Sequence, residues 1–245
     1  MTPDTAFPLR LTGELDPEVS RWQWLFKLLL AIPHFIVLFF LLIGFVLSTV
    51  VAGFAILFTG RYPRRIFDFN VGVLRWSWRV GFYSYSALGT DKYPSFSLAD
   101  DPAYPARLDV AYPERLSRGL VLVKWWLLAI PQYLIVAIFT GGAWSAWSGD
   151  GDGVLYATAG GLIGLLVLFA GLSLLFTGRY PRSLYDFVLG LNRWVFRVVA
   201  YAGLMTDTYP PFRLDSGSTE PPTAPVTATP ASATPTPAPT PLPTV

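Results

Sequence analysis

The 245-residue sequence contains no cysteine and a single histidine, His34. The absence of cysteine excludes disulfides, thiolate catalysis and cysteine-ligated metal sites. No Walker A, H-E-x-x-H or G-x-S-x-G sequence is present either, so the motif signatures of P-loop nucleotide binding, zinc proteases and serine hydrolases are missing. We therefore expect no enzymatic activity, no catalytic residues, no metal and no cofactor.

Charged residues are also scarce. They make up 14% of the chain, against about 25% in soluble proteins, while hydrophobic residues make up 53% and aromatic residues 16%. This composition is typical of a membrane protein with many interfacial aromatic side chains. The formal net charge of +2 is too small to indicate a nucleic-acid partner. The first residues do not form a secretory signal peptide, because acidic residues precede any short apolar run.

A long internal repeat dominates the sequence. Residues 58–80 read FTGRYPRRIFDFNVGVLRWSWRV and residues 176–198 read FTGRYPRSLYDFVLGLNRWVFRV, with 14 of 23 positions identical. Because internal repeats define the architecture of a chain, we predict one membrane repeat over 1–100 and a second over 101–215. The remaining segment, 216–245, is rich in proline and threonine and is predicted to be disordered.

Three shorter matches extend the repeat in both directions. FPLRL recurs as YPARL, TDKYPSFSL recurs as TDTYPPFRL, and SRWQWLFKLLLAIP recurs as SRGLVLVKWWLLAIP with one residue inserted. The segments FPLRLTGEL, YPARLDV, FSLAD and FRLD alternate apolar and polar residues, which is typical of short strands. We expect a small sheet that pairs the start and the end of each repeat.

The first repeat has no charged residue from Leu28 to Gly60. As a helix, its apolar stretch would exceed the hydrocarbon thickness of about 30 Å. The matching region of the second repeat carries about twenty extra residues with Asp150 and Asp152, which cannot lie unsatisfied in lipid. The sequence therefore predicts two transmembrane hairpins with tips near Gly44 and at 140–153, although a single long tilted helix in the first repeat is an alternative.

In the hairpin interpretation, all 18 basic residues lie on one side of the membrane. Loops rich in lysine and arginine remain in the cytoplasm. The hairpins therefore predict a multi-pass protein of the cell membrane with both termini cytoplasmic.

The repeated motif also predicts an amphipathic helix in each copy, over 64–88 and 182–204. Thr-Gly ends the preceding helix, and Tyr-Pro turns the chain. Four residues at helical spacing then form one face of the new helix: Asp68, Gly72, Arg75 and Arg79 in the first copy, and Asp186, Gly190, Arg193 and Arg197 in the second.

Three interpretations of these arginines remain open. The side chains could extend to the membrane surface and hold the helix there. Together with Arg61 and Arg179, they could bind anionic lipid headgroups, since guanidinium groups match phosphate oxygens. They could also form ion pairs with Asp68 and Asp186. For His34, whose counterpart is Gln132, we expect a hydrogen bond between helices, because glutamine does not titrate.

The segments AIPH, FTGRYPR, DFNVGVLRW and TDKYPSF of the first copy, with AIPQ, FTGRYPR, DFVLGLNRW and TDTYPPF of the second, are similar to a bacterial family. This family of integral membrane proteins, common in actinomycete-type genomes, is defined only as a domain of unknown function. The resemblance implies tandem membrane copies and assigns no site residue.

We thus expect an all-α membrane protein of two tandem repeats, each with a transmembrane hairpin, an interfacial amphipathic helix and short flanking strands. The leading hypothesis is a non-enzymatic module that organises anionic lipid or a partner protein, including a second copy of itself, at the cytoplasmic leaflet. The alternative is a small transporter, or a transporter subunit, with a path between the repeats. A lipid-modifying enzyme is a third interpretation.

Overall fold

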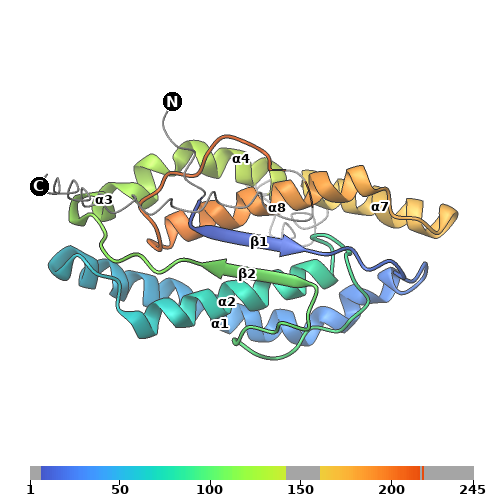
Figure 1. Ribbon diagram of the computed structural model, residues 1–245, viewed down its shortest axis with the longest axis horizontal. Coiled ribbons are helices and arrows are strands. Elements are labelled where there is room, and N and C mark those ends of the chain that lie inside the picture. The colour runs from blue at the N-terminus through green and yellow to red at the C-terminus, as the bar shows by residue number, and fades with distance from the viewer. Residues whose placement is uncertain (1–6, 142–160, 216, 218–245) are drawn as a thin grey trace, which may run out of the picture. The chain divides into compact units, whose positions relative to one another are not determined.

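Each repeat contributes one strand followed by helices, two in the first repeat and a more divided set in the second (Figure 1). The computed structural model describes residues 7–141, 161–215 and 217. In the first repeat these form β1 (Leu9–Gly13), α1 (Trp24–Thr59) and α2 (Arg64–Tyr83). In the second they form β2 (Ala106–Val110), α3 (Arg118–Val123), the π-helical turn η1 (Lys124–Leu128), α4 (Ile130–Thr140), α7 (Leu162–Thr177) and α8 (Arg182–Ala202). The predicted disordered segment 216–245, apart from residue 217, lies outside this range.

The two strands pair with each other in an antiparallel sheet. Leu11 pairs with Leu108, and these leucines occupy equivalent positions in FPLRL and YPARL. A local twofold axis therefore passes through this pair and relates the two repeats. The predicted sheet, which joined the start and end of the same repeat, is wrong: the starts of both repeats pair instead, and FSLAD and FRLD form no strand.

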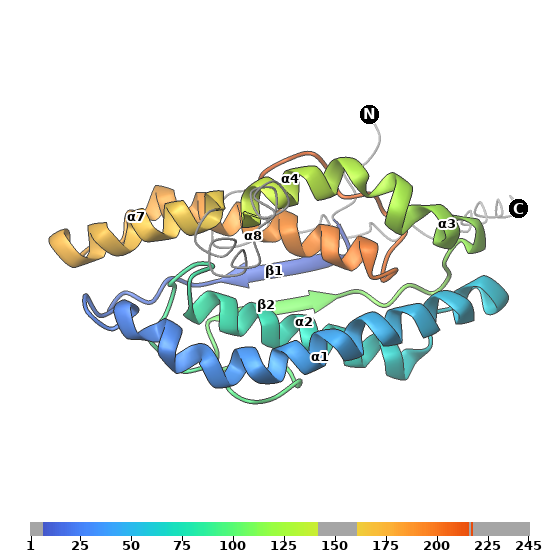
Figure 2. The same cartoon turned by 180° about the vertical axis from the view of Figure 1, so that it is seen from behind.

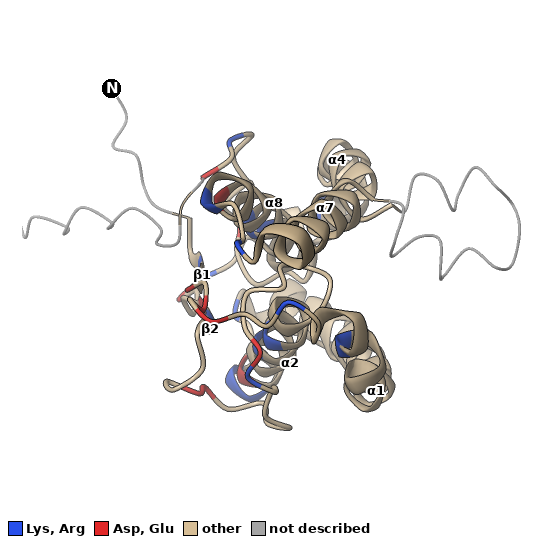
Figure 3. Cartoon of the chain, turned by 90° about the vertical axis from the view of Figure 1, so that its right-hand side faces the viewer, with Lys and Arg blue, Asp and Glu red and all other residues tan. Residues whose placement is uncertain are grey.

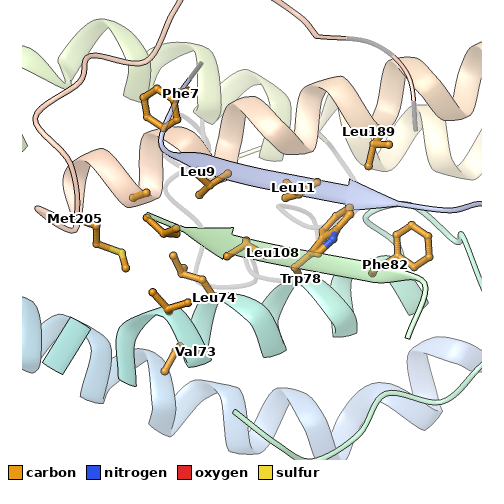
Figure 4. Packing of buried hydrophobic residues seen from close by; sticks show 14 of the residues in the cluster. Phe7, Leu9, Leu11, Val73, Leu74, Trp78, Phe82, Leu108, Leu189 and Met205 are labelled. Atoms are coloured by element: carbon orange, nitrogen blue, oxygen red, sulfur yellow. The ribbon is translucent and has the colours of Figure 1, made fainter. Parts of the chain in front are cut away.

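Each amphipathic helix packs against the strand of the other repeat. Helix α2 contacts β2, and α8 contacts β1. Apolar residues of both strands, including Leu11 and Leu108, fill the space between the helices together with Trp78, Phe82 and Leu189 (Figure 4). Because the strands are exchanged in this way, the main core is built from both repeats, and a smaller cluster of Leu38, Trp76 and Val80 lies within the first repeat.

Helix α1 is a single helix of 36 residues that continues through Pro33 and Gly44. At a rise of about 1.5 Å per residue it is about 54 Å long. The predicted hairpin of the first repeat, with its tip near Gly44, is therefore wrong, and the alternative of one long helix is the observed one. A lone glycine lowers helix stability by only about 1 kcal/mol relative to alanine, and the apolar residues around Gly44 provide no capping group.

In the second repeat, the equivalent of α1 is built in pieces. Helices α3, η1 and α4 correspond to its first part, and α7 corresponds to its second part. An added Cβ on Gly161 would lie 2.4 Å from the backbone nitrogen of Gly141, so the chain returns at 161 to the end of α4. The extra residues thus interrupt a helix near its middle. The predicted loop at 140–153 falls mostly on 142–160, outside the described residues.

The π-helical turn η1 lies where the second repeat carries its one-residue insertion. A π-helical turn accommodates an extra residue within a helix. Lys124 before the turn and Gln132 after it are both buried, as are their counterparts Lys27 and His34 in α1. The turn therefore keeps equivalent side chains on the same face of the helix despite the insertion.

The long and amphipathic helices form two layers beside the sheet. Figure 2 shows α1 along one side of α2, and Figure 3 shows α1, α4 and α7 on the side opposite the strands. Helices are observed at both predicted positions, with starts at Arg64 and Arg182, and both end earlier than expected, at Tyr83 and Ala202.

Of the described helices, α1 is the one that is long and apolar enough to cross a membrane by itself. The pieces 118–128 and 130–140 meet this criterion only as a pair bent by 46°, and α7 is shorter. Because α1 is unbroken, Arg21 and Arg61 lie beyond its opposite ends. The predicted gathering of all basic residues on one side of a membrane therefore loses its structural basis, and so does the orientation deduced from it.

Candidate functional site

The predicted arginine face of each amphipathic helix lies against protein. Arg75 donates from Nε to the carbonyl of Leu108 (2.9 Å) and pairs through NH2 with Asp109 (2.6 Å). At the equivalent position, Arg193 donates from Nε to the carbonyl of Leu11 (2.8 Å) and from NH1 to the carbonyl of Asp215 (2.7 Å). These two arginines thus connect the amphipathic helices to the central pair of the sheet.

The next arginine of each face is buried. Arg79 donates to the carbonyls of Ser97 and Ala99, and burial lowers the pKa of its guanidinium. Arg197 pairs with Asp215 (2.7 Å). Both arginines therefore fix the segment that ends their own repeat.

The small residues of the face allow that segment to approach. An added Cβ on Gly72 would lie 2.8 Å from the Cβ of Leu98, and one on Gly190 would lie 3.4 Å from the carbonyl oxygen of Asp215. The predicted ion pairs between Asp68 or Asp186 and these arginines are not formed; Asp68 pairs weakly with Arg64 on the surface (3.4 Å). The aspartate, glycine and two arginines of each helix do share one face, as predicted. Three of the four arginines on these two faces are almost completely buried.

Arg61 and Arg179 are exposed, and each follows the end of a long apolar helix. The repeated Thr-Gly-Arg sequence forms the same cap twice. Gly60 and Gly178 adopt left-handed conformations with φ of 71° and 69°, which glycine tolerates without steric cost. The preceding threonine hydroxyl accepts from the backbone N–H of the arginine at 3.1 and 3.2 Å. The cap directs the chain, and with it the arginine, away from the helix axis.

The tyrosine that follows each arginine reaches into the other repeat. Tyr62 donates its hydroxyl to the carbonyl of Gly203 (3.3 Å), and Tyr180 donates to the carbonyl of Ala87 (2.9 Å). Burial raises the pKa of Tyr62 to about 12. These contacts hold the caps at opposite ends of the molecule in fixed positions.

A basic pocket lies at the cap of α1. It is lined by Thr59, Gly60, Leu116 and three exposed arginines, Arg61, Arg115 and Arg118. A main-chain hydrogen bond from Leu116 N to the Gly60 carbonyl (2.9 Å) joins the two segments that form it. In the part of the chain that the structure describes, none of the three arginines forms an ion pair with a carboxylate. The carboxyl end of a helix carries about half a negative charge, so three guanidinium groups leave the pocket strongly positive.

The equivalent location at the cap of α7 is less basic. Arg179 corresponds to Arg61, and Arg21, whose guanidinium packs against Gly178, corresponds to Arg118. In the ungapped alignment of residues 7–21 with 104–118, however, Glu18 takes the place of Arg115. The twofold axis therefore relates a pocket with three positive charges to a location with two positive charges and one negative charge.

Sequence analysis missed a buried ion pair in each repeat. Lys27 has no exposed surface, pairs with Asp91 (2.7 Å) and donates to the carbonyl of Thr90 (2.7 Å). Lys124 is equally buried, pairs with Asp207 (2.9 Å) and donates to the carbonyl of the preceding threonine (2.6 Å). The signal was present, because a lysine inside an apolar run and a Thr-Asp pair recur in both copies. The hairpin interpretation instead places these lysines, with all other basic residues, on one side of the membrane.

His34 and Gln132 fulfil the predicted hydrogen-bonding role. Trp76 donates its indole N–H to Nδ1 of His34 (3.1 Å), and Trp194 donates to Oε1 of Gln132 (2.7 Å). The His34 ring also stacks on Phe96, with ring centroids 3.9 Å apart. These residues tie the long helix to the amphipathic helix of the same repeat. No cluster of potential metal ligands is found among the described residues.

Comparisons with known proteins agree with this architecture of two copies. No curated protein and no solved structure matches the sequence. One family model, described as a domain of unknown function (DUF4389), matches residues 21–97 and 153–213. The first region spans most of the first repeat and the second region spans the later part of the second repeat, and together they cover more than half of the chain. The chain belongs to the DUF4389 family.

Proposed function

We propose that this protein is a non-enzymatic, membrane-associated module that binds anionic lipid headgroups through the basic pocket at the cap of α1. The observation that carries the proposal is the convergence of Arg61, Arg115 and Arg118 without a carboxylate partner beside the exposed apolar end of α1. Phe58, the residue before the cap, is 74% exposed. A ligand with an anionic head and apolar chains suits both features.

The arginines of the amphipathic helices have another role in this proposal. Arg75, Arg79, Arg193 and Arg197 are engaged by backbone carbonyls and by aspartates, so they hold the scaffold. Headgroup binding falls to the exposed caps, and most strongly to the cap of α1. Arg179, with Arg21 and Glu18 beside it, would form a weaker second site.

The transport alternative needs a path between the repeats, and the contacts there give it little support. Trp24 of the first repeat packs against Gly171 of the second, where an added Cβ would lie 3.2 Å from its ring. In the symmetric contact, Val121 packs near Gly53 at 3.8 Å.

The proposal is tested by vesicle binding. Purified protein is titrated with vesicles of phosphatidylcholine alone and with vesicles containing phosphatidylglycerol, and the ratio of the two affinities is measured. A basic residue near an anionic surface contributes about 1 kcal/mol. Replacing Arg61, Arg115 and Arg118 together by glutamine should therefore reduce the preference for anionic vesicles about 100-fold, while binding to neutral vesicles persists.

The equivalent location at the cap of α7 provides a matched control. Arg21→Gln with Arg179→Gln removes two arginines at the equivalent location and should reduce the preference less than Arg61→Gln with Arg118→Gln. The single change Arg115→Glu gives the cap of α1 the residue type that Glu18 provides at the equivalent position of the first repeat, and it should weaken anionic binding. If the triple variant keeps the preference of the wild type, or if both pairs of substitutions have the same effect, the pocket is not the headgroup site.

A further inference from the structure

The exposed apolar surface of the molecule lies on one side. Eighteen of the 36 residues of α1 are large hydrophobic residues with exposed side chains, among them Phe26, Phe40 and Phe54. Helices α4 and α7 expose further ones, such as Leu134 and Phe169. We call the exposed hydrophobic residues of α1, α3, η1, α4 and α7 the apolar face. Figure 3 shows α1, α4 and α7 on the side away from the strands, and acidic residues lie at and near the strands.

The apolar face has no acidic residue. None of α1, α3, η1, α4 and α7 contains an aspartate or a glutamate, and the lysines at 27 and 124 are buried. An apolar surface of this extent exceeds the few hundred Å² that soluble monomers expose, so it requires a partner. The partner must accept an apolar surface along the full length of α1.

Helix α1 is longer than an upright crossing of the membrane requires. The helix is about 54 Å long, whereas the hydrocarbon core of a bilayer measures about 30 Å. A helix standing across the membrane would leave exposed apolar residues, including Phe26 and Phe58, in water at its two ends. It would also bring the strands, which lie beside its middle part (Figure 2), into the hydrocarbon region. The strands carry Arg107 and Asp109, which are 52% and 68% exposed.

Charge at the ends of the apolar face indicates what covers it. Arg21 and Arg179 lie beyond one end of α1, and Arg61, Arg115 and Arg118 lie beyond the other; all five are exposed. Exposed tryptophans at positions 22, 125 and 126 accompany them, and tryptophan is enriched at the level of lipid headgroups. An apolar surface bordered at both ends by arginine fits an anionic bilayer better than a second copy of the chain, whose arginines would repel those of the first.

We propose that the protein lies in one leaflet of the membrane, with α1 and the α4–α7 pair parallel to the membrane plane. The apolar face enters the acyl chains to a depth of about 5–10 Å, as interfacial helices do, and the sheet faces water. The basic pocket then lies at headgroup level. The seating requires membrane association but not headgroup binding in the pocket, so the two proposals fail separately.

Depth measurements test this seating. Because the chain has no cysteine, single spin labels are introduced at Phe26, Phe40 and Phe54. These residues are spaced by fourteen positions and so lie within about 80° of one another around the helix. In reconstituted bilayers, collision rates with oxygen and with a water-soluble nickel complex report depth. Seating in one leaflet gives all three labels the same shallow depth, within about 5 Å of one another.

A crossing helix gives a different pattern. Positions 26 and 54 are about 42 Å apart along the axis, so both would lie at or beyond opposite membrane surfaces while position 40 lay at the bilayer centre. Protection of all three labels from both oxygen and nickel would indicate that a second copy covers the face. Either pattern overturns the proposal.

Labelling from the two sides of the membrane provides an independent check. Glu18→Cys and Arg65→Cys are exposed positions near opposite ends of α1, and both leave the apolar face intact. In intact cells and in inverted membrane vesicles, an impermeant maleimide should modify both cysteines from the same face. Modification from opposite faces shows a crossing and refutes the seating in one leaflet. Circular dichroism of each variant confirms that the helices remain.

Discussion

The buried lysines offer the most direct test of how the repeats are held. Lys27 and Lys124 are completely buried and paired, whereas Lys92, the third lysine of the chain, is exposed. Replacing Lys27 by methionine leaves Asp91 with the backbone N–H of Ser20 as its remaining donor. Breaking a fully buried pair costs about 3–5 kcal/mol. Because the Asp91 side chain is 19% exposed and water reaches it, we expect about 2–3 kcal/mol.

Thermal unfolding in mild detergent, followed by circular dichroism, measures this loss. For chains of about 150–250 residues, 1 kcal/mol corresponds to about 2–4 °C, so Lys27→Met should unfold roughly 5–10 °C below the wild type. Lys124→Met removes the symmetric contact and should have a similar effect. Lys92→Met, at an exposed position, should change stability by less than about 0.5 kcal/mol.

A double variant separates charge from packing. Lys27→Met combined with Asp91→Asn removes both charges and keeps an acceptor for Ser20, so it should recover more than half of the loss. If Lys27→Met and Lys124→Met each cost less than about 1 kcal/mol, the ion pairs do not support the fold in the way described. Equal losses of stability for Lys27→Met, Lys124→Met and Lys92→Met would also contradict this role of the buried ion pairs.

Three further predictions concern packing, register and pH. Gly72→Ala should destabilise the protein by about 1–3 kcal/mol, because the added Cβ would lie 2.8 Å from the Cβ of Leu98. Gly190→Ala should be nearly neutral in the same unfolding assay, because its Cβ would lie 3.4 Å from the nearest atom, the carbonyl oxygen of Asp215. Deleting Trp125 should convert η1 to an α-helix and keep Gln132 on the face of the lysine before it, because seven residues then separate the two as they separate Lys27 from His34, so cooperative melting should persist. Burial raises the pKa of Tyr62 from 10 to about 12, so the native state binds the proton more tightly than the unfolded state does. The free energy of unfolding should therefore be highest below pH 10 and fall as the pH rises to 12. Tyr62→Phe should reduce this dependence of the unfolding free energy on pH, as measured by denaturant titrations.

Much of the fold could be predicted from local patterns. The repeat, the glycine caps and the starts of both amphipathic helices follow from residue spacing alone, and the structure confirms them at Gly60, Gly178, Arg64 and Arg182. The shared face of Asp68, Gly72, Arg75 and Arg79 is likewise local. These features depend on contacts within a few residues, which sequence periodicity reports well.

The errors concern contacts between distant residues. Strand alternation predicts a strand but not its partner, so the exchange of β1 and β2 between repeats could not be deduced, nor could the capture of Arg75 by the carbonyl of Leu108. The hairpin prediction failed because an insertion that leaves and re-enters the middle of a helix resembles a loop between two helices. Helix length distinguishes these cases only when the surroundings of the helix are known.

The two copies also separate scaffold from candidate function. Contacts that recur across the twofold axis, such as those of Lys27 and Lys124 or of the two capping tyrosines, build the fold, because each copy needs them. His34 and Gln132 differ in chemistry yet accept the same indole hydrogen bond, so this difference is structurally conservative. The exchange of Arg115 for Glu18 is not conservative, because it reverses a charge at an exposed cap without altering a core contact. Under the proposed headgroup binding, a difference that leaves the scaffold unchanged while altering the surface charge should give the two ends of the molecule distinct affinities for anions.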